Sequence, residues 1–156
     1  MSQIKVDSII PRGGLPSGAS GGIIQMVQTI KTDKFVTSST SYTDITGLSV
    51  TITPQSSSNK ILVFTNVRLG SGATGQDNKY QILRGSTAIS ADNFCRMPSS
   101  SEAWPFADIN LDSPGTTSAT TYKVQCKAET NEVFVNRDGS NRDFGMSYIT
   151  VMEVGM

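Results

Sequence analysis

Hydrophobic and polar residues alternate with a period of two along much of this chain. In Leu48–Thr53 and in Tyr122–Lys127, apolar and polar side chains take strictly alternating positions. Such alternation is typical of β-strands that bury one face and leave the other in water. No apolar repeat of 3.6 residues extends over a helical window, so the pattern predicts short strands joined by turns and no long helix.

From residue 23 onward, β-rich runs are separated by clusters of Gly, Pro, Ser, Asn and Asp, which are turn-forming residues. The predicted strands are Ile23–Ile30, Lys34–Thr37, Ser41–Ile45, Leu48–Thr53, Lys60–Leu69, Lys79–Leu83, Thr87–Ile89, Phe106–Leu111, Thr120–Lys127, Glu132–Asn136 and Met146–Val154. Many short strands at close spacing indicate an all-β domain, either an antiparallel sandwich or a barrel.

Two of the predicted strands contain stretches that are more continuously apolar than the alternating strands. These runs are Ile61–Phe64 and Ile149–Met152. Continuous apolar sequence is expected where both faces of a strand leave water, either in the centre of a fold or at a contact between subunits.

Residues 1–22 differ in composition from the rest of the chain. Ile4, Val6, Ile9 and Ile10 form a short β-prone stretch, and a segment rich in Gly, Pro and Ser follows it. We expect an extended attachment arm over 1–22 that pairs with the edge of another protein, ahead of a β-sandwich domain over 23–156. The alternative is a terminal tail without fixed structure.

Charge and composition exclude several classes of function. The chain has 13 Lys and Arg, 13 Asp and Glu and no His, so it lacks the basic field that collects nucleic acid and the commonest catalytic base and metal ligand. We expect neither an enzyme nor a bound cofactor or metal. No apolar run reaches the ~20 residues of a membrane span, and no signal peptide is visible.

Cys95 and Cys126 lack metal-site spacing and are interpreted as buried free thiols, with a disulfide as the alternative.

Two patterns resemble catalytic or ligand sites. Residues 70–75 have the letters of the GxGxxG dinucleotide motif, but another β-rich run follows them in place of the helix that such a motif requires. Asp92, Glu102, Asp108 and Asp112 lie near one another in sequence without the spacing of a calcium loop. We interpret the first pattern as an inter-strand loop and the second as solvated carboxylates.

An aromatic group lies in a segment rich in Pro and Ser. Phe94, Trp104 and Phe106 occur there together with Met97. We expect these rings to pack over one end of the sandwich, because Pro105 restricts the backbone at Trp104. The alternative is an exposed platform on which a sugar stacks, so the three aromatic residues are also a candidate ligand surface.

Several segments resemble virion proteins of bacteriophages of the marine and cyanobacterial type. The opening Ile4–Ile9 resembles the N-terminal motif of phage tail fibres, and the runs Ser41–Pro54 and Lys60–Val63 resemble a domain of such virion proteins. Later segments continue the resemblance, namely Ile82–Thr87, Leu111–Gly115, Thr121–Gln125 and Ile149–Val154. The general plan is also similar to the trimeric jelly roll of the tumour-necrosis-factor and complement globular heads.

The resemblance implies a jelly-roll-like antiparallel β-sandwich that assembles as a homotrimer, and a thin Ser/Thr-rich core favours self-association as well. It implies a non-enzymatic structural protein of the virion, assembled in the host cytoplasm: a head fibre, a capsid decoration or cement protein, or a short tail fibre. Its partners would be its own copies and other capsid or tail proteins. The alternative function is a carbohydrate-binding receptor module that binds a host surface glycan.

Overall fold

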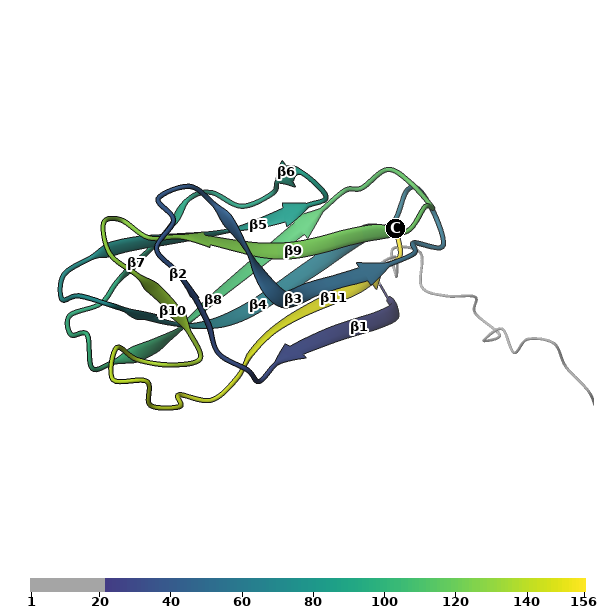
Figure 1. Cartoon of the computed structure of the whole chain (residues 1–156). Helices are drawn as coiled ribbons and strands as arrows, with labels where there is room; N and C mark the ends of the chain where they lie inside the picture. The colour runs from purple at the N-terminus through teal and green to yellow at the C-terminus, as the bar shows by residue number, and fades with distance from the viewer. Residues whose placement is uncertain (1–21) are drawn as a thin grey trace, which may run out of the picture.

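The computed structural model describes residues 22–156, which form eleven β-strands and no helix. The strands, labelled in Figure 1, are β1 (Ile23–Lys31), β2 (Phe35–Thr37), β3 (Thr43–Ile52), β4 (Lys60–Ser71), β5 (Asp77–Arg84), β6 (Thr87–Ala88), β7 (Asn93–Arg96), β8 (Ala103–Asp112), β9 (Thr120–Lys127), β10 (Val133–Val135) and β11 (Ser147–Val154). The all-β class predicted from the alternating pattern is confirmed.

The first sheet is built around β4, a strand of 12 residues. β8 pairs with one edge of β4, while β11 and β10 pair with successive parts of the other edge. β1 then pairs with β11, and β2 pairs with β10. This sheet therefore has four strand positions, with β8 at one edge and β1 and β2 at the other.

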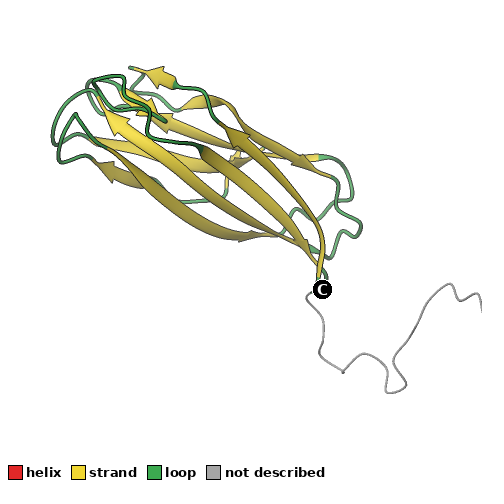
Figure 2. Ribbon diagram, turned by 90° about the horizontal axis from the view of Figure 1, so that it is seen from below, coloured by secondary structure: helices red, strands yellow, loops and turns green. Residues whose placement is uncertain are grey.

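The second sheet places β3, β9 and β5 side by side, and both β6 and β7 pair with the remaining edge of β5. If β1/β2, β6/β7 and β10/β11 are each taken as one position, the chain fills four positions per sheet. It crosses to the other sheet after every position except β5, which is the strand order of a jelly roll. Figure 2 shows the strands of both layers running along the length of the domain. The predicted jelly-roll-like sandwich is confirmed.

The core lies between the two sheets and is formed by alternate side chains of each strand. Ile61, Val63 and Val67 of β4 are fully buried there, as are Tyr122 and Val124 of β9. The residues between them on the same strands point outward. The two sheets thus share one core and present two separate outer faces.

Most predicted strands are found with small shifts in their bounds, and β9 has the predicted bounds. β3 joins two predicted strands, because Gly47 takes a φ of 81° and the strand continues past an irregularity in its pairing between Asp44 and Ser49. β7 was not predicted, because its four residues belong to the segment rich in Pro and Ser that was interpreted as irregular. β8 begins before the predicted Phe106 and includes Pro105, which an edge strand tolerates because the missing N–H need not break the ladder.

A buried carboxylate ties β1 and β11 to the loop between β3 and β4 at the end of the domain where β1 begins. Glu153 of β11 is fully buried and accepts hydrogen bonds from Gln25 Nε2 and Asn59 Nδ2, both at 2.6 Å, and from the Gln55 backbone N–H at 2.7 Å. Burial favours a raised pKa, but these hydrogen bonds outweigh it and lower the pKa of Glu153. The backbone N–H of Gly155 donates to Gly22 O at 3.0 Å at the same end.

Candidate functional site

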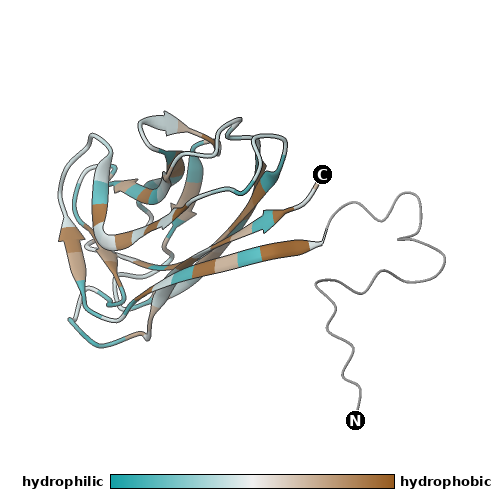
Figure 3. Ribbon diagram, turned by 90° about the vertical axis from the view of Figure 1, so that its right-hand side faces the viewer, coloured by the Kyte–Doolittle hydropathy of each residue, from teal (hydrophilic) through white to brown (hydrophobic). Residues whose placement is uncertain are grey.

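The outer face of the first sheet is apolar. Because residues 61, 63, 65 and 67 of β4 point into the core, the residues between them point outward, and these include Leu62 and Phe64. In Figure 3, brown bands recur along β1, the strand that follows the grey segment. Met26 and Ile30 of that strand are 60% and 51% exposed.

Strand register aligns the outward residues of β1, β11, β4 and β8 into rows across the sheet. From β1 to β8 the rows are Met26, Met152, Leu62 and Leu111; then Gln28, Thr150, Phe64 and Ile109; then Ile30, Tyr148, Asn66 and Ala107. The rings of Phe64 and Tyr148 stack at the centre, with centroids 6.1 Å apart. We call this set of rows the apolar face.

Charged side chains are confined to the ends of the apolar face. Lys60 and Arg68 lie at outward positions at the two ends of β4. None of the outward positions on the described lengths of β1, β11, β4 and β8 carries a carboxylate. Ile109 and Leu111 on the edge strand β8 are 61% and 57% exposed, so the apolar face remains open to solvent in a single chain. A contiguous apolar surface of this extent is typical of an interaction site.

The outer face of the second sheet is polar, and its side chains bond to one another. Gln81 Nε2 donates to Gln125 Oε1 at 2.9 Å, and Gln125 Nε2 donates to Asp44 Oδ1 at 2.7 Å. Lys123 Nζ donates to Asp44 Oδ2 at 2.8 Å. We call this surface, which spans β3, β9 and β5, the polar face. Its hydrogen-bonding groups are largely paired within the chain, which suits a surface that faces water.

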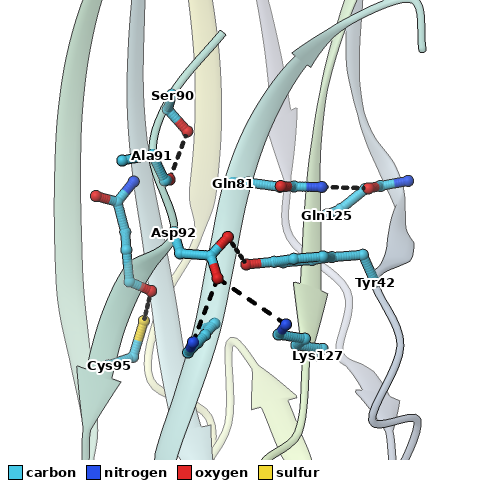
Figure 4. Close-up of polar contacts among 10 residues, drawn as sticks. Tyr42, Gln81, Ser90, Ala91, Asp92, Cys95, Gln125 and Lys127 are labelled. Atoms are coloured by element: carbon cyan, nitrogen blue, oxygen red, sulfur yellow. Dashed lines mark hydrogen bonds and ion pairs between the residues drawn. The ribbon is translucent and has the colours of Figure 1, made fainter. Parts of the chain in front are cut away.

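A second polar cluster lies beside these residues, as Figure 4 shows. Tyr42 Oη donates to Asp92 Oδ1 at 2.8 Å, and Lys79 Nζ donates to Asp92 Oδ2 at 3.3 Å. The bonds from Tyr42 and Lys79 lower the pKa of Asp92, while burial and the same carboxylate raise the pKa of Tyr42. Lys127 Nζ lies 4.4 Å from the centroid of the Tyr42 ring. The cluster keeps Asp92 ionised and Tyr42 protonated, so the Tyr42 phenol is not an activated nucleophile.

An open groove of about 360 Å³ lies at one end of the polar face. Its lining residues are Thr40, Asp77, Lys79, Phe94, Lys127, Ala128 and Glu129. The Phe94 ring is 61% exposed, and Lys79 Nζ lies 4.4 Å from its centroid. The groove therefore offers an aromatic surface flanked by charges of both signs.

The three aromatic residues predicted as a candidate ligand surface do not come together. Phe94 lies on the outer side of β7, whereas Phe106 points into the core of the sandwich and its ring lies 6.3 Å from that of Tyr80. Trp104 lies on the edge strand β8, is 49% exposed and donates from Nε1 to Glu102 Oε2 at 3.1 Å. The expectation that these side chains pack holds for Phe106, which packs against the core, and for buried Met97, whereas Phe94 and Trp104 are exposed.

The acidic residues that lie near one another in sequence have separate local partners. Asp112 accepts from Arg84 and from Tyr122, whereas Asp108 accepts from Asn93. Within residues 22–156, no three His, Cys, Asp or Glu side chains form a possible metal site. The predicted arm residues Ile4, Val6, Ile9 and Ile10 lie outside the described range.

The dinucleotide-like motif packs as part of a strand and turn. Gly70 and Ser71 belong to β4, and a Cβ atom on Gly70 would collide with the backbone oxygen of Arg137. The glycine is thus required for close approach of two backbones. The interpretation of this segment as inter-strand structure is confirmed, with the correction that its first two residues lie in β4.

Both cysteines are buried free thiols, as predicted. Cys95 and Cys126 lie on strands at opposite edges of β5, and this placement separates them by more than one strand spacing. A disulfide needs Cα atoms closer than about 7 Å. Burial raises the pKa of Cys126 to about 12, so this thiol is not a reactive thiolate.

Comparisons with known proteins found similarity in structure but no match in sequence. No model of a protein family matches the sequence, and no curated protein matches it. The VP2 subviral particle structure of infectious bursal disease virus aligns over 93% of this chain and 44% of its own, with 13% identity and a TM-score of 0.46. A structure of the Gt strain of this virus aligns over 97% of this chain and 44% of its own, again with 13% identity and a TM-score of 0.46.

A bacterial protein shows similar likeness. Dimeric latent PorU from Porphyromonas gingivalis aligns over 89% of this chain and 14% of its own, with 9% identity and a TM-score of 0.41. The chain spans less than half the length of each of these proteins. Residues 22–156 include no helix of the length and hydropathy that a membrane span requires.

Proposed function

We propose that this chain is a non-enzymatic structural protein of a virus particle of the bacteriophage type, displayed as a head fibre, a capsid decoration or a short tail fibre. The observation that supports this most directly is the apolar face, which extends across all four strand positions of the first sheet. A surface of this kind indicates a protein that works by assembling with other chains. We propose that the assembly is a homotrimer that forms in the host cytoplasm and joins the virion.

Attachment to the particle is assigned to residues 1–22. The sandwich begins at one end of the domain, where Gly22 bonds to Gly155, so an arm that precedes β1 would leave from that end. The β-prone residues Ile4, Val6 and Ile9 would add a strand to a capsid or tail protein. Both outer faces of the sandwich would then stay clear of the attachment point.

Labelling of intact particles tests the proposed location. Gold-labelled antibodies against the sandwich should decorate particles of the phage whose genome encodes this chain, at the head or at the tail. Antibodies against an internal protein of the same phage should leave intact particles unlabelled. If the chain is present in the lysate but cannot be detected on purified particles, the proposal is contradicted.

Deleting residues 1–22 separates attachment from folding. The shortened chain should retain the far-ultraviolet dichroism of a β-sandwich, because the core side chains of the described residues 22–156 pack against one another. It should be missing from purified particles. Loss of the β-sheet signal would show that the segment belongs to the core, and normal incorporation would contradict its role as an anchor.

A second candidate function is a carbohydrate-binding receptor module, and the groove beside Phe94 favours it. An exposed ring can stack on a sugar, while the carboxylates of Asp77 and Glu129 can accept hydrogen bonds from hydroxyl groups. A glycan array with the full chain tests it, with Phe94→Ala as the variant that should lose binding. Trp104→Ala is the matched control, because Trp104 is exposed and does not line the groove.

A further inference from the structure

We infer that the apolar face is the surface by which copies of this chain join, with the first sheet of each copy turned toward a threefold axis and the second sheet turned outward. This inference rests on the proposed trimeric assembly and names the surface that forms it. The partner is therefore a second and a third copy of this chain.

The chemistry of the apolar face fits a copy of the same chain. Its three rows are formed mainly by Met, Leu, Ile, Phe and Tyr, and its two charged residues, Lys60 and Arg68, lie at the ends. With 13 basic and 13 acidic residues the chain has no net charge to keep copies apart. A strongly charged partner such as nucleic acid would find no complementary charge on these rows.

The size of the apolar face also fits an interface between folded proteins. Strand positions about 4.8 Å apart and a rise of about 3.3 Å per residue give a rectangle on the order of 500 Å² for four strands from Lys60 to Arg68. Side chains that project from this rectangle have a larger accessible area. A standard specific interface buries about 800 Å² on each partner, so the whole face is of the order of one such interface. In a trimer this area is divided between two neighbours.

Both halves of the apolar face carry large apolar side chains, which a ring of copies requires; the β1/β11 half also holds Gln28 and Thr150, which bond to each other at 2.8 Å. The half on β1 and β11 contains Met26, Ile30, Tyr148 and Met152, and the half on β4 and β8 contains Leu62, Phe64, Ile109 and Leu111. In a cyclic trimer each copy meets two neighbours through two different surfaces. The β1/β11 half of one copy can pack against the β4/β8 half of the next.

The central strands of the first sheet and the polar face on the second sheet are both consistent with this orientation. The stacked Phe64 and Tyr148 rings lie on the central strands β4 and β11, so they would be closest to the axis. The polar face lies on the other side of the sandwich, where Gln125 and Asp44 are already bonded within the chain. Solvent would therefore contact the sheet whose side chains are polar.

Mass measurement on the full chain tests the inference. Sedimentation equilibrium should give a trimer of roughly 50 kDa, three times the chain mass of 16.7 kDa. The double variant Ile109→Glu with Leu111→Glu should raise the trimer dissociation constant at least 100-fold. Both side chains are more than half exposed in the single chain, so its dichroism should remain that of the wild type.

The matched control places two glutamates on β3, which is an edge strand of the second sheet. Ser49→Glu with Thr51→Glu changes two outward positions of β3, also two residues apart, on the polar face. This variant should remain trimeric. If the β8 variant fails to fold, Met26→Glu with Ile30→Glu on β1 tests the opposite half, which the ring needs equally.

The outcomes separate this inference from the proposed function. A trimer that survives the substitutions on β8 or on β1 would overturn the assigned surface and leave the virion role intact. A dimeric wild-type chain would overturn the threefold arrangement. A monomeric chain would overturn the inference, whether its apolar face then binds phosphatidylcholine vesicles or is covered by residues 1–21. Failure of the antibodies to label particles would instead overturn the virion role alone.

Discussion

The two outer faces of the sandwich are built on the same type of antiparallel sheet and carry opposite chemistry. The polar face pairs Gln81 with Gln125 and Asp44 with Lys123, so the chain satisfies its own polar groups there. The apolar face exposes Met26, Ile109 and Leu111. A strand that buries one face alternates apolar and polar residues, whereas a strand that buries both faces is continuously apolar. In the proposed assembly, the first sheet loses water on both faces, whereas the second sheet keeps one face in water.

The largest expected effect is a loss of stability that distinguishes two neighbouring residues of β4. Ile61 is fully buried between the sheets, so Ile61→Ala should lower the free energy of unfolding by about 2–5 kcal/mol at every protein concentration. Leu62→Ala, on the apolar face, should act mainly on trimer formation. Urea unfolding at two protein concentrations measures both effects. Equal losses for the two variants in the monomer would contradict the assignment of opposite faces.

The next largest effect is expected in acid, which should loosen the end of the domain where Glu153 binds β1 and the loop between β3 and β4. The pKa of Glu153 in the folded chain is lowered below its usual 4.5, so its stabilisation is complete above pH 4.5 and is lost as the pH falls through the folded value. Glu153→Gln should be less stable at pH 7 and should lose less stability in acid. Urea unfolding between pH 7 and pH 3 checks this.

Other carboxylates with lowered pKa values, including Asp44 and Asp92, also contribute to acid sensitivity. The difference between wild type and Glu153→Gln isolates the contribution of Glu153. Parallel pH profiles for the two proteins would show that Glu153 does not stabilise the end of the domain.

A smaller effect should appear in the dependence of stability on protein concentration. Copies that bind one another only when folded stabilise the fold by mass action, so the Tm of the wild type should rise when the concentration is increased. Phe64→Ala removes a ring from the centre of the apolar face and should reduce this rise. Differential scanning calorimetry at several concentrations measures it. A wild-type Tm that is independent of concentration would argue against the trimer.

The smallest effect is expected on the polar face. Asp44→Asn breaks an exposed ion pair with Lys123, and such pairs contribute about 0–1 kcal/mol. The variant should stay trimeric, and its small loss of stability should shrink further in high salt. A change of oligomeric state in this variant would mean that the polar face also takes part in assembly.

The sequence predicted those features of the fold that depend on local pattern. Strict alternation in Tyr122–Lys127 predicted β9 and its wet side, where Lys123 and Gln125 now lie. The apolar runs Ile61–Phe64 and Ile149–Met152 predicted strands that are central or at a subunit contact, and β4 and β11 are central. Both runs also contribute to the apolar face.

Long-range pairing was beyond the reach of sequence patterns. Met26 and Leu111 belong to one row only because β11 and β4 lie between them, and that register depends on strands distant in sequence. Phe94 and Phe106 were grouped because they are close in sequence. The chain crosses to the other sheet between β7 and β8, so one ring lies on an outer face and the other in the core.

Methionine oxidation in the wild-type chain tests the central claim without any substitution. Met26 on the apolar face and Met156 at the C-terminus are 60% and 61% exposed in the single chain. Peroxide should oxidise them at similar rates if both stay in water. If copies cover the apolar face, Met26 should form its sulfoxide at least about tenfold more slowly than Met156 under trimer conditions, and should catch up on dilution. Equal rates at high protein concentration, measured by mass spectrometry of the peptides, would contradict assembly through this face.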